Sequence, residues 1–143
     1  MRSEVLIVDD DARQRADLAE LISSIGLSAV TVADGKEALN RQETSPAGVI
    51  LTDLMMPRMD GFELLKQLAA RGDYTPAIVL TGFGTIDQAV SVVHDLKAFW
   101  FLEKPVQPAI LKALVERAMQ QSRLLDDAEA SSQIYAAFDL SAA

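Results

Sequence analysis

The sequence predicts an α/β domain with a five-stranded parallel sheet and helices on both of its faces. Short apolar runs alternate with segments whose apolar residues recur every three or four positions, which is the spacing of one helix face. Residues that suit helix N-caps follow most of the runs, each with Glu or Gln three positions later. Strict alternation of strand and helix is typical of parallel sheets with right-handed crossovers.

The expected strands are nearly continuous apolar runs, as in strands that are buried on both faces. They span residues 5–8, 29–33, 49–52, 77–80 and 98–102. Four capping pairs mark the helices that follow the first four strands: Asp11/Gln14, Asp34/Glu37, Asp60/Glu63 and Thr85/Gln88. Pro108 opens a fifth helix. The apolar stripes of the last three helices are expected to place Phe62, Val90 and Ile110 against the core.

Composition limits the classes of protein that fit. The chain has 143 residues, of which 50% are hydrophobic, so we expect one globular domain. A net charge of −8 argues against nucleic-acid binding by this domain. No run approaches the length of a membrane span, and a strand begins too early for a signal peptide. The absence of cysteine excludes disulfides, and we expect a cytoplasmic protein with no membrane partner.

The chain changes character at about Arg123. Residues 126–132 are polar, whereas Ile134, Tyr135 and Phe138 are apolar residues with no obvious core to join. We therefore divide the sequence into a domain at 1–122 and a helix extension or linker at 123–143. The extension either continues into a longer chain or pairs with a second copy.

Chemically active side chains follow four of the strands. Asp9 and Asp10 come after the first strand, Asp53 ends the third, Thr81 ends the fourth and Lys104 comes just after the fifth. In a parallel sheet these positions share the carboxyl edge, where ligands bind. For each residue alone, an ordinary role at a turn, a cap or the surface is the simpler explanation. Their joint placement favours a site.

Three carboxylates at one edge repel one another, by about 4 kcal/mol per pair at about 4 Å and an effective dielectric constant of about 20. Such a pocket either raises a pKa or holds a cation. Because the ligands are all oxygen, we expect Mg²⁺, for which Mn²⁺ can substitute. A lysine and a hydroxyl facing that ion suit a phosphoryl group, and a carboxylate can accept one as an aspartyl phosphate.

Four separated motifs resemble the receiver domain of two-component response regulators over roughly residues 3–122. They are VDD at 8–10, D-x-x-M-P-x-M-D-G at 53–61, Thr81 at a strand end, and F-L-E-K-P at 101–105. The segments G-T-I-D-Q-A-V at 84–90 and F-L-E-K-P at 101–105 are most similar to receivers of sigma-54-dependent, enhancer-binding activators. The resemblance implies a flavodoxin-like (βα)5 fold with strand order 2-1-3-4-5 and, in this chain, an extended last helix.

The resemblance also implies roles for the edge residues. Asp53 would accept a phosphoryl group from a phosphohistidine of a sensor histidine kinase, and Lys104 would pair with the acyl phosphate. Asp10, Asp53 and the backbone carbonyl of Met55 would bind Mg²⁺ directly, with Asp9 acting through water. The peptide bond between Lys104 and Pro105 is usually cis in the family.

A switch is implied as well, in a regulatory phospho-acceptor domain rather than an enzyme. Thr81 would hydrogen-bond the phosphoryl group, and Phe101 would move into the space that Thr81 leaves. The surface of the fourth helix, fifth strand and fifth helix would then control an output domain or a target protein. A second copy of the chain is a candidate partner, through that surface or the last helix.

Two positions depart from the family pattern. Lys97 stands where glycine is common, so a helix end with positive φ would be strained there. Trp100 stands where a small or acidic residue is usual, and it is either extra core or part of a partner-binding patch.

Two other classes of protein compete with the receiver hypothesis. A haloacid-dehalogenase-like phosphohydrolase would need a second acid two residues after Asp53, where this chain has Met55. A flavodoxin-like binding module would need a phosphate loop after the first strand, where Asp9, Asp10 and Asp11 would repel a phosphate.

Overall fold

A computed structural model describes residues 3–82 and 86–142, with side chains up to Asp126. Five parallel strands form one sheet in the order β2-β1-β3-β4-β5, which confirms the predicted fold and strand order. The strands are β1 (Glu4–Val8), β2 (Ser28–Val32), β3 (Val49–Asp53), β4 (Ala77–Thr81) and β5 (Trp100–Glu103). The helices are α1 (Ala12–Ser24), α2 (Gly35–Thr44), α3 (Gly61–Ala70), α4 (Ile86–Leu96) and α5 (Pro108–Ala142).

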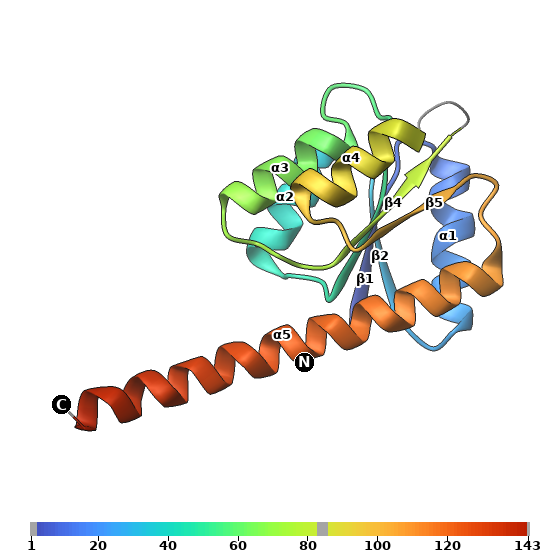
Figure 1. Ribbon diagram of the computed structural model, residues 1–143. Helices are drawn as coiled ribbons and strands as arrows, with labels where there is room; N and C mark the ends of the chain where they lie inside the picture. Colours follow the sequence, from blue (N-terminus) through green and yellow to red (C-terminus); the bar gives the residue numbers. More distant parts are fainter. Residues whose placement is uncertain (1–2, 83–85, 143) are drawn as a thin grey trace.

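The helices cover both faces of the sheet and create two separate apolar layers. Figure 1 shows α2, α3 and α4 on one face, and α1 with the first part of α5 on the other. The layer under α2, α3 and α4 contains Leu6, Ile50 and Leu64, and the layer under α1 and α5 contains Ile7, Leu51 and Leu111. Successive residues of a strand therefore point to opposite layers, which explains why the strand sequences are continuously apolar.

Capping interactions fix where the first three helices begin. Asp11, Asp34 and Asp60 each accept a hydrogen bond from the backbone N–H three residues later, at 3.0, 2.9 and 2.8 Å respectively. Thr85, the cap predicted for α4, lies outside the described residues. Since each cap follows a strand closely, the caps also fix the loops at the carboxyl edge of the sheet.

The predicted helix stripes are too wide. Phe62, Val90 and Ile110 are exposed instead of buried, while Leu64, Val92 and Val115 face the core. A helix lying on a sheet buries only a narrow face, so apolar residues at the border of the stripe stay in water. The second and fifth strands also begin at Ser28 and Trp100, instead of at residues 29 and 98.

Trp100 is not part of the core. Its side chain is 49% exposed, on the edge strand β5, and its ring stacks on that of Phe101 with centroids 5.6 Å apart. The extra-core explanation of this residue is therefore wrong.

The last helix is much longer than the sheet requires. It continues without a break to Ala142 and projects well beyond the rest of the domain (Figure 1). The division of the chain at residue 122 stays a prediction. Within the part of the chain that the structure describes, no helix is long and apolar enough to cross a bilayer.

Lys97, just after α4, has the strained backbone that its sequence position suggests, with φ at 59°. A side chain in this left-handed region is unfavourable, whereas glycine adopts it freely. We expect Lys97→Gly to raise the free energy of unfolding by about 0.5–1 kcal/mol, measured by urea denaturation. Lys97→Ala is the matched control, because it removes the side chain but keeps the strain. An equal gain from the alanine variant would contradict this explanation.

Candidate functional site

The ends of β1 and β3 bring three carboxylates together at the carboxyl edge of the sheet. One carboxylate oxygen from each of Asp9, Asp10 and Asp53 lies within 4.8 Å of the other two. Asp9 is fully buried and Asp53 is only 6% exposed, whereas Asp10 faces solvent. β1 and β3 are neighbours in the sheet, so these side chains meet as the sequence predicts.

Asp9 is the most constrained of the three. Its Oδ1 accepts a hydrogen bond from the Asp11 backbone N–H at 2.9 Å. Its Oδ2 is the buried side-chain polar atom that has no hydrogen-bond partner among the described residues. Burial raises the pKa of Asp9 above its ordinary value of 3.8, and the charges of Asp53 and Asp10 raise it further. A buried carboxylate oxygen without a donor calls for a proton or a cation.

Lys104 supplies the positive charge in the pocket. Its Nζ lies 2.8 Å from Asp53 Oδ2. The sheet order places β5 two strand spacings, about 10 Å, from β3, so a long side chain is needed to cross the end of β4. The Lys104 backbone N–H donates to the Thr81 carbonyl at 2.7 Å, which anchors the residue to β4, and the Lys104–Pro105 peptide bond is cis.

Thr81 ends β4, the strand that lies between β3 and β5 in the sheet. Its side chain is fully buried, and its hydroxyl donates to the Leu102 carbonyl in a long hydrogen bond of 3.4 Å. Phe101, the other predicted switch residue, is partly buried against the apolar layer under α4. The two residues therefore belong to adjacent strands, and β5, which carries Phe101, is an edge strand of the sheet.

The loop between β3 and α3 packs closely against Asp53. A Cβ atom added at Gly61 would lie 2.6 Å from the Asp53 carbonyl oxygen, so only glycine fits there without a backbone shift. The Gly61 backbone N–H also donates to the Leu54 carbonyl at 2.8 Å. Met55, in the same loop, is 55% exposed. The glycine of the second motif thus fixes the backbone that carries Asp53.

Two residues of the first turn of α1 reach the site and were not predicted to do so. The Gln14 Oε1 accepts a hydrogen bond from Lys104 Nζ at 3.3 Å, and Arg15 Nη1 donates to the Asp9 carbonyl at 2.7 Å. The sequence assigns Gln14 only to the capping box of Asp11. The available signal is position: both residues stand one helical turn after the acids of β1.

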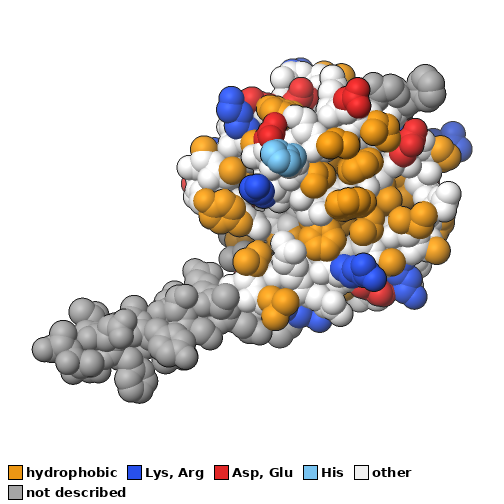
Figure 2. Space-filling model, in the orientation of Figure 1, with side chains coloured by type: hydrophobic (Ala, Val, Ile, Leu, Met, Phe, Trp, Pro, Cys, Tyr) orange, Lys and Arg blue, Asp and Glu red, His pale blue; other side chains and the backbone are white. Residues whose placement is uncertain are grey.

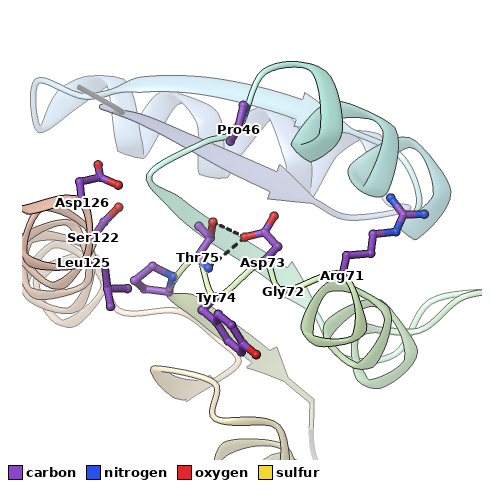
Figure 3. A pocket seen from close by; sticks show the side chains of 10 residues that line it. Pro46, Arg71, Gly72, Asp73, Tyr74, Thr75, Ser122, Leu125 and Asp126 are labelled. Atoms are coloured by element: carbon purple, nitrogen blue, oxygen red, sulfur yellow. Dashed lines mark hydrogen bonds between the residues drawn. The ribbon is translucent and has the colours of Figure 1, made fainter. Parts of the chain in front are cut away.

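A separate cavity lies away from the acids. It has a volume of about 500 Å³ and is lined by residues that include Pro46, Tyr74, Ser122 and Leu125 (Figure 3). Pro46 precedes β3 and Tyr74 precedes β4, so the cavity is at the amino edge of the sheet, opposite the acids. The acid cluster is therefore separate from this cavity.

The fold and the pocket define a doubly wound α/β domain of the flavodoxin-like class with an acid–lysine cluster at its carboxyl edge. Within this class the chain belongs to the response regulator receiver domain family, whose family model matches residues 5–116. The protein is accordingly the receiver domain of a two-component response regulator.

Known proteins support this assignment. The chain is 33% identical to the transcriptional regulatory protein FixJ of Bradyrhizobium diazoefficiens over 95% of its own length and 66% of that protein's length. It is 40% identical to the regulator NtrC of Klebsiella pneumoniae over 79% of its length and 24% of that protein's. NtrC is of the sigma-54-dependent type. The chain thus spans from about a quarter to about two thirds of the length of these relatives.

A solved structure agrees with the fold. The response regulator receiver domain protein of Clostridium thermocellum superposes with a TM-score of 0.80 and 26% identity, covering 86% of this chain and 98% of that one.

Proposed function

We propose that Asp53 accepts a phosphoryl group from a phosphohistidine of a sensor histidine kinase. The observation that supports this most directly is the Lys104 ammonium, 2.8 Å from Asp53 in a pocket of three carboxylates. In the transfer, an Asp53 carboxylate oxygen bonds to phosphorus while the bond from phosphorus to the donor imidazole nitrogen breaks. Lys104 stabilises the charge on the phosphoryl oxygens.

The pocket fits a hard divalent cation such as Mg²⁺. All the charged ligands are carboxylates, and Asp9 Oδ2 lacks a donor within the described part of the chain. Asp10, Asp53 and the Met55 carbonyl would hold the ion, with Asp9 acting through water, and Mn²⁺ would substitute. When bound, the ion neutralises charge on the carboxylates and the phosphoryl group. The repulsion among the three carboxylates would therefore favour binding of the ion.

Phosphorylation would reach the surface through Thr81. Its hydroxyl now makes a long bond to the Leu102 carbonyl, and a phosphoryl oxygen is a stronger acceptor for the same proton. Moving Thr81 frees space beside β5, into which Phe101 would turn. The conformer in which Thr81 and Lys104 bind the phosphoryl group more strongly becomes more populated. The size of the shift is set by the difference in interaction free energy between the two conformers.

The output surface would be the face of α4, β5 and α5. Figure 2 shows hydrophobic side chains gathered over this face. Val90 of α4, Trp100 of β5 and Ile110 of α5 are among the large exposed hydrophobic residues of these elements. Exposed apolar patches of this kind serve as interaction sites. The partner would be an effector domain, a target protein or a second copy of the chain. The relatives are longer than this chain and are regulators, which supports the first.

The function is regulatory rather than enzymatic. A haloacid-dehalogenase-like hydrolase would use a second acid at position 55, and Met55 cannot act as one. In a receiver, slow loss of the phosphoryl group lets the modified state persist long enough to act. Asp53 would thus be a site of modification, and its own chemistry would serve only to gain and lose the group.

The proposal is tested by incubating the protein with acetyl phosphate and Mg²⁺, followed by intact mass spectrometry and size-exclusion chromatography. We expect a mass gain of one phosphoryl group that requires Mg²⁺. No gain should occur when the Mg²⁺ is chelated before the donor is added. A change of elution volume would identify the second copy as partner. No mass gain with either acetyl phosphate or a phosphorylated kinase would refute the function.

Magnesium should stabilise the protein in a pH-dependent way. Because the folded-state pKa of Asp9 is raised, folded protein holds this proton more tightly than the unfolded chain. Protonated Asp9 therefore makes its whole contribution to the free energy of unfolding at pH values below 3.8. That contribution is lost as the pH rises through the raised pKa. Mg²⁺ at ten times its Kd should add about 1.4 kcal/mol at neutral pH and much less near pH 4.

Thermal unfolding at both pH values, with and without Mg²⁺, measures this effect. Asp9→Asn is the informative variant, since it removes the buried charge: without Mg²⁺ it should be more stable than wild type at neutral pH, and it should respond less to Mg²⁺. Equal stabilisation by Mg²⁺ at the two pH values would show that the acids are not the binding site.

A further inference from the structure

We propose that Gln14 is a positioning residue that holds the Lys104 ammonium over Asp53. This inference rests on the proposed phosphoryl transfer and adds a residue that the motifs do not contain. Its basis is the hydrogen bond of 3.3 Å from Lys104 Nζ to Gln14 Oε1, next to the ion pair of 2.8 Å with Asp53.

The capping box predicted from the sequence cannot close, and this frees the Gln14 side chain. In a complete box, Gln14 would accept a hydrogen bond from the Asp11 backbone N–H. That N–H instead donates to Asp9 Oδ1, at 2.9 Å. The Gln14 backbone N–H still donates to Asp11 Oδ1, so the helix start is kept without the side chain. The carboxamide is then available for Lys104.

Lysine needs such a partner at this place. Its side chain has several rotatable bonds, and ordering it costs free energy that each fixed contact offsets. An ammonium group only donates hydrogen bonds, so the oxygen of the Gln14 amide must face it. Gln14 lies on the first turn of α1, next to β1, whereas Lys104 follows β5. The two contacts hold the ammonium from two different elements.

Gln14 should matter most when Asp53 changes its charge. As the carboxylate becomes an acyl phosphate, the negative charge beside Lys104 moves outward onto the phosphoryl oxygens. Gln14 is neutral and stands on a helix, so its contact does not depend on that change. It keeps the ammonium in the pocket both before and after transfer, which favours the transition state if the lysine is already in place.

The test is Gln14→Met, which keeps length and helix propensity but removes the acceptor. We expect phosphorylation by acetyl phosphate to slow by roughly five- to twentyfold, the loss of one charge-assisted hydrogen bond at a partly exposed site. Gln121→Met, at an exposed position of α5, is the matched control and should behave as wild type. In a Lys104→Ala background, Gln14→Met should cause no further loss, because its partner is absent.

The outcomes separate the two proposals. If wild-type protein gains no phosphoryl group from any donor, the proposed function fails. If it does, but Gln14→Met reacts at the wild-type rate, or slows the Lys104→Ala protein equally, Gln14 does not act through Lys104 and this inference is wrong. Should Lys104→Ala react too slowly to follow, the same cycle is measured on the free energy of unfolding. A coupling of zero there would overturn the inference as well.

Discussion

Asp53→Asn is expected to abolish phosphorylation by acetyl phosphate. The variant keeps the shape of the side chain at the end of β3 but removes the nucleophilic carboxylate, and an amide oxygen does not form an acyl phosphate under these conditions. We expect a loss of at least about 10³-fold in the initial rate, beyond the effect of removing a single stabilising donor. Intact mass spectrometry over a time course measures it.

The fold should survive this change. Asn at position 53 removes one of three repelling carboxylates and also the ion partner of Lys104, so the two effects on stability oppose each other. Asp34→Asn is the control, because Asp34 caps α2 and Asn caps helices equally well. Phosphorylation of the Asp53→Asn protein at the control's rate would place the acceptor at another residue.

Lys104→Ala is the second large effect. Removing the ammonium takes away a fixed donor for the phosphoryl oxygens, so we expect a loss of about 10²–10³-fold in the rate of phosphorylation. It also leaves the acids without their cation. Since the Lys104 side chain is 26% exposed, the cost in the absence of Mg²⁺ should be about 1–3 kcal/mol of unfolding free energy, less than for a fully buried pair.

The two effects are measured on the same protein samples. Initial rates come from intact mass spectrometry, and unfolding free energies come from urea denaturation with and without Mg²⁺. Mg²⁺ should recover part of the stability but not the rate, because the ion offsets the carboxylate charge without replacing the lysine. Lys112→Ala, an exposed lysine on α5, is the control. A rate within about twofold of the control would remove Lys104 from the mechanism.

The sequence was sufficient for the architecture because two local signals agree. Continuous apolar runs indicate strands that are buried on both faces, and the caps at Asp11, Asp34 and Asp60 set the helix starts. With parallel strands, every residue at a strand end must reach one edge. The meeting of Asp9, Asp10, Asp53 and Lys104 therefore follows from topology.

The features that the sequence did not predict are those in which alternative contacts compete for the same group. The capping-box pattern predicts that the Asp11 backbone N–H donates to the Gln14 side chain, but in the structure it donates to Asp9 Oδ1. No local pattern contains that choice, since it depends on how β1 ends. Phe62 and Ile110 show a similar limit: a helical period locates the centre of an apolar stripe, whereas the shape of the neighbouring layer sets its width.

Trp100 is a third case of the same kind. The sequence left open whether it is extra core or part of a partner-binding patch. On the edge strand β5, its side chain lies against its neighbour Phe101 while about half of it stays in water. Burial at a sheet edge is decided by whatever lies beyond the edge, and Trp100 stays about half exposed there.

The central claim is that the phosphoryl group resides on Asp53, and borohydride trapping tests it most directly. Reduction converts an aspartyl phosphate to homoserine, so peptide mass spectrometry after treatment with acetyl phosphate and Mg²⁺ locates the modified residue without any mutation. We predict homoserine at position 53 in the treated protein and Asp53 in the untreated one. Homoserine at position 9 or 10, or a phosphoryl group that resists borohydride on a hydroxyl side chain, would contradict the account.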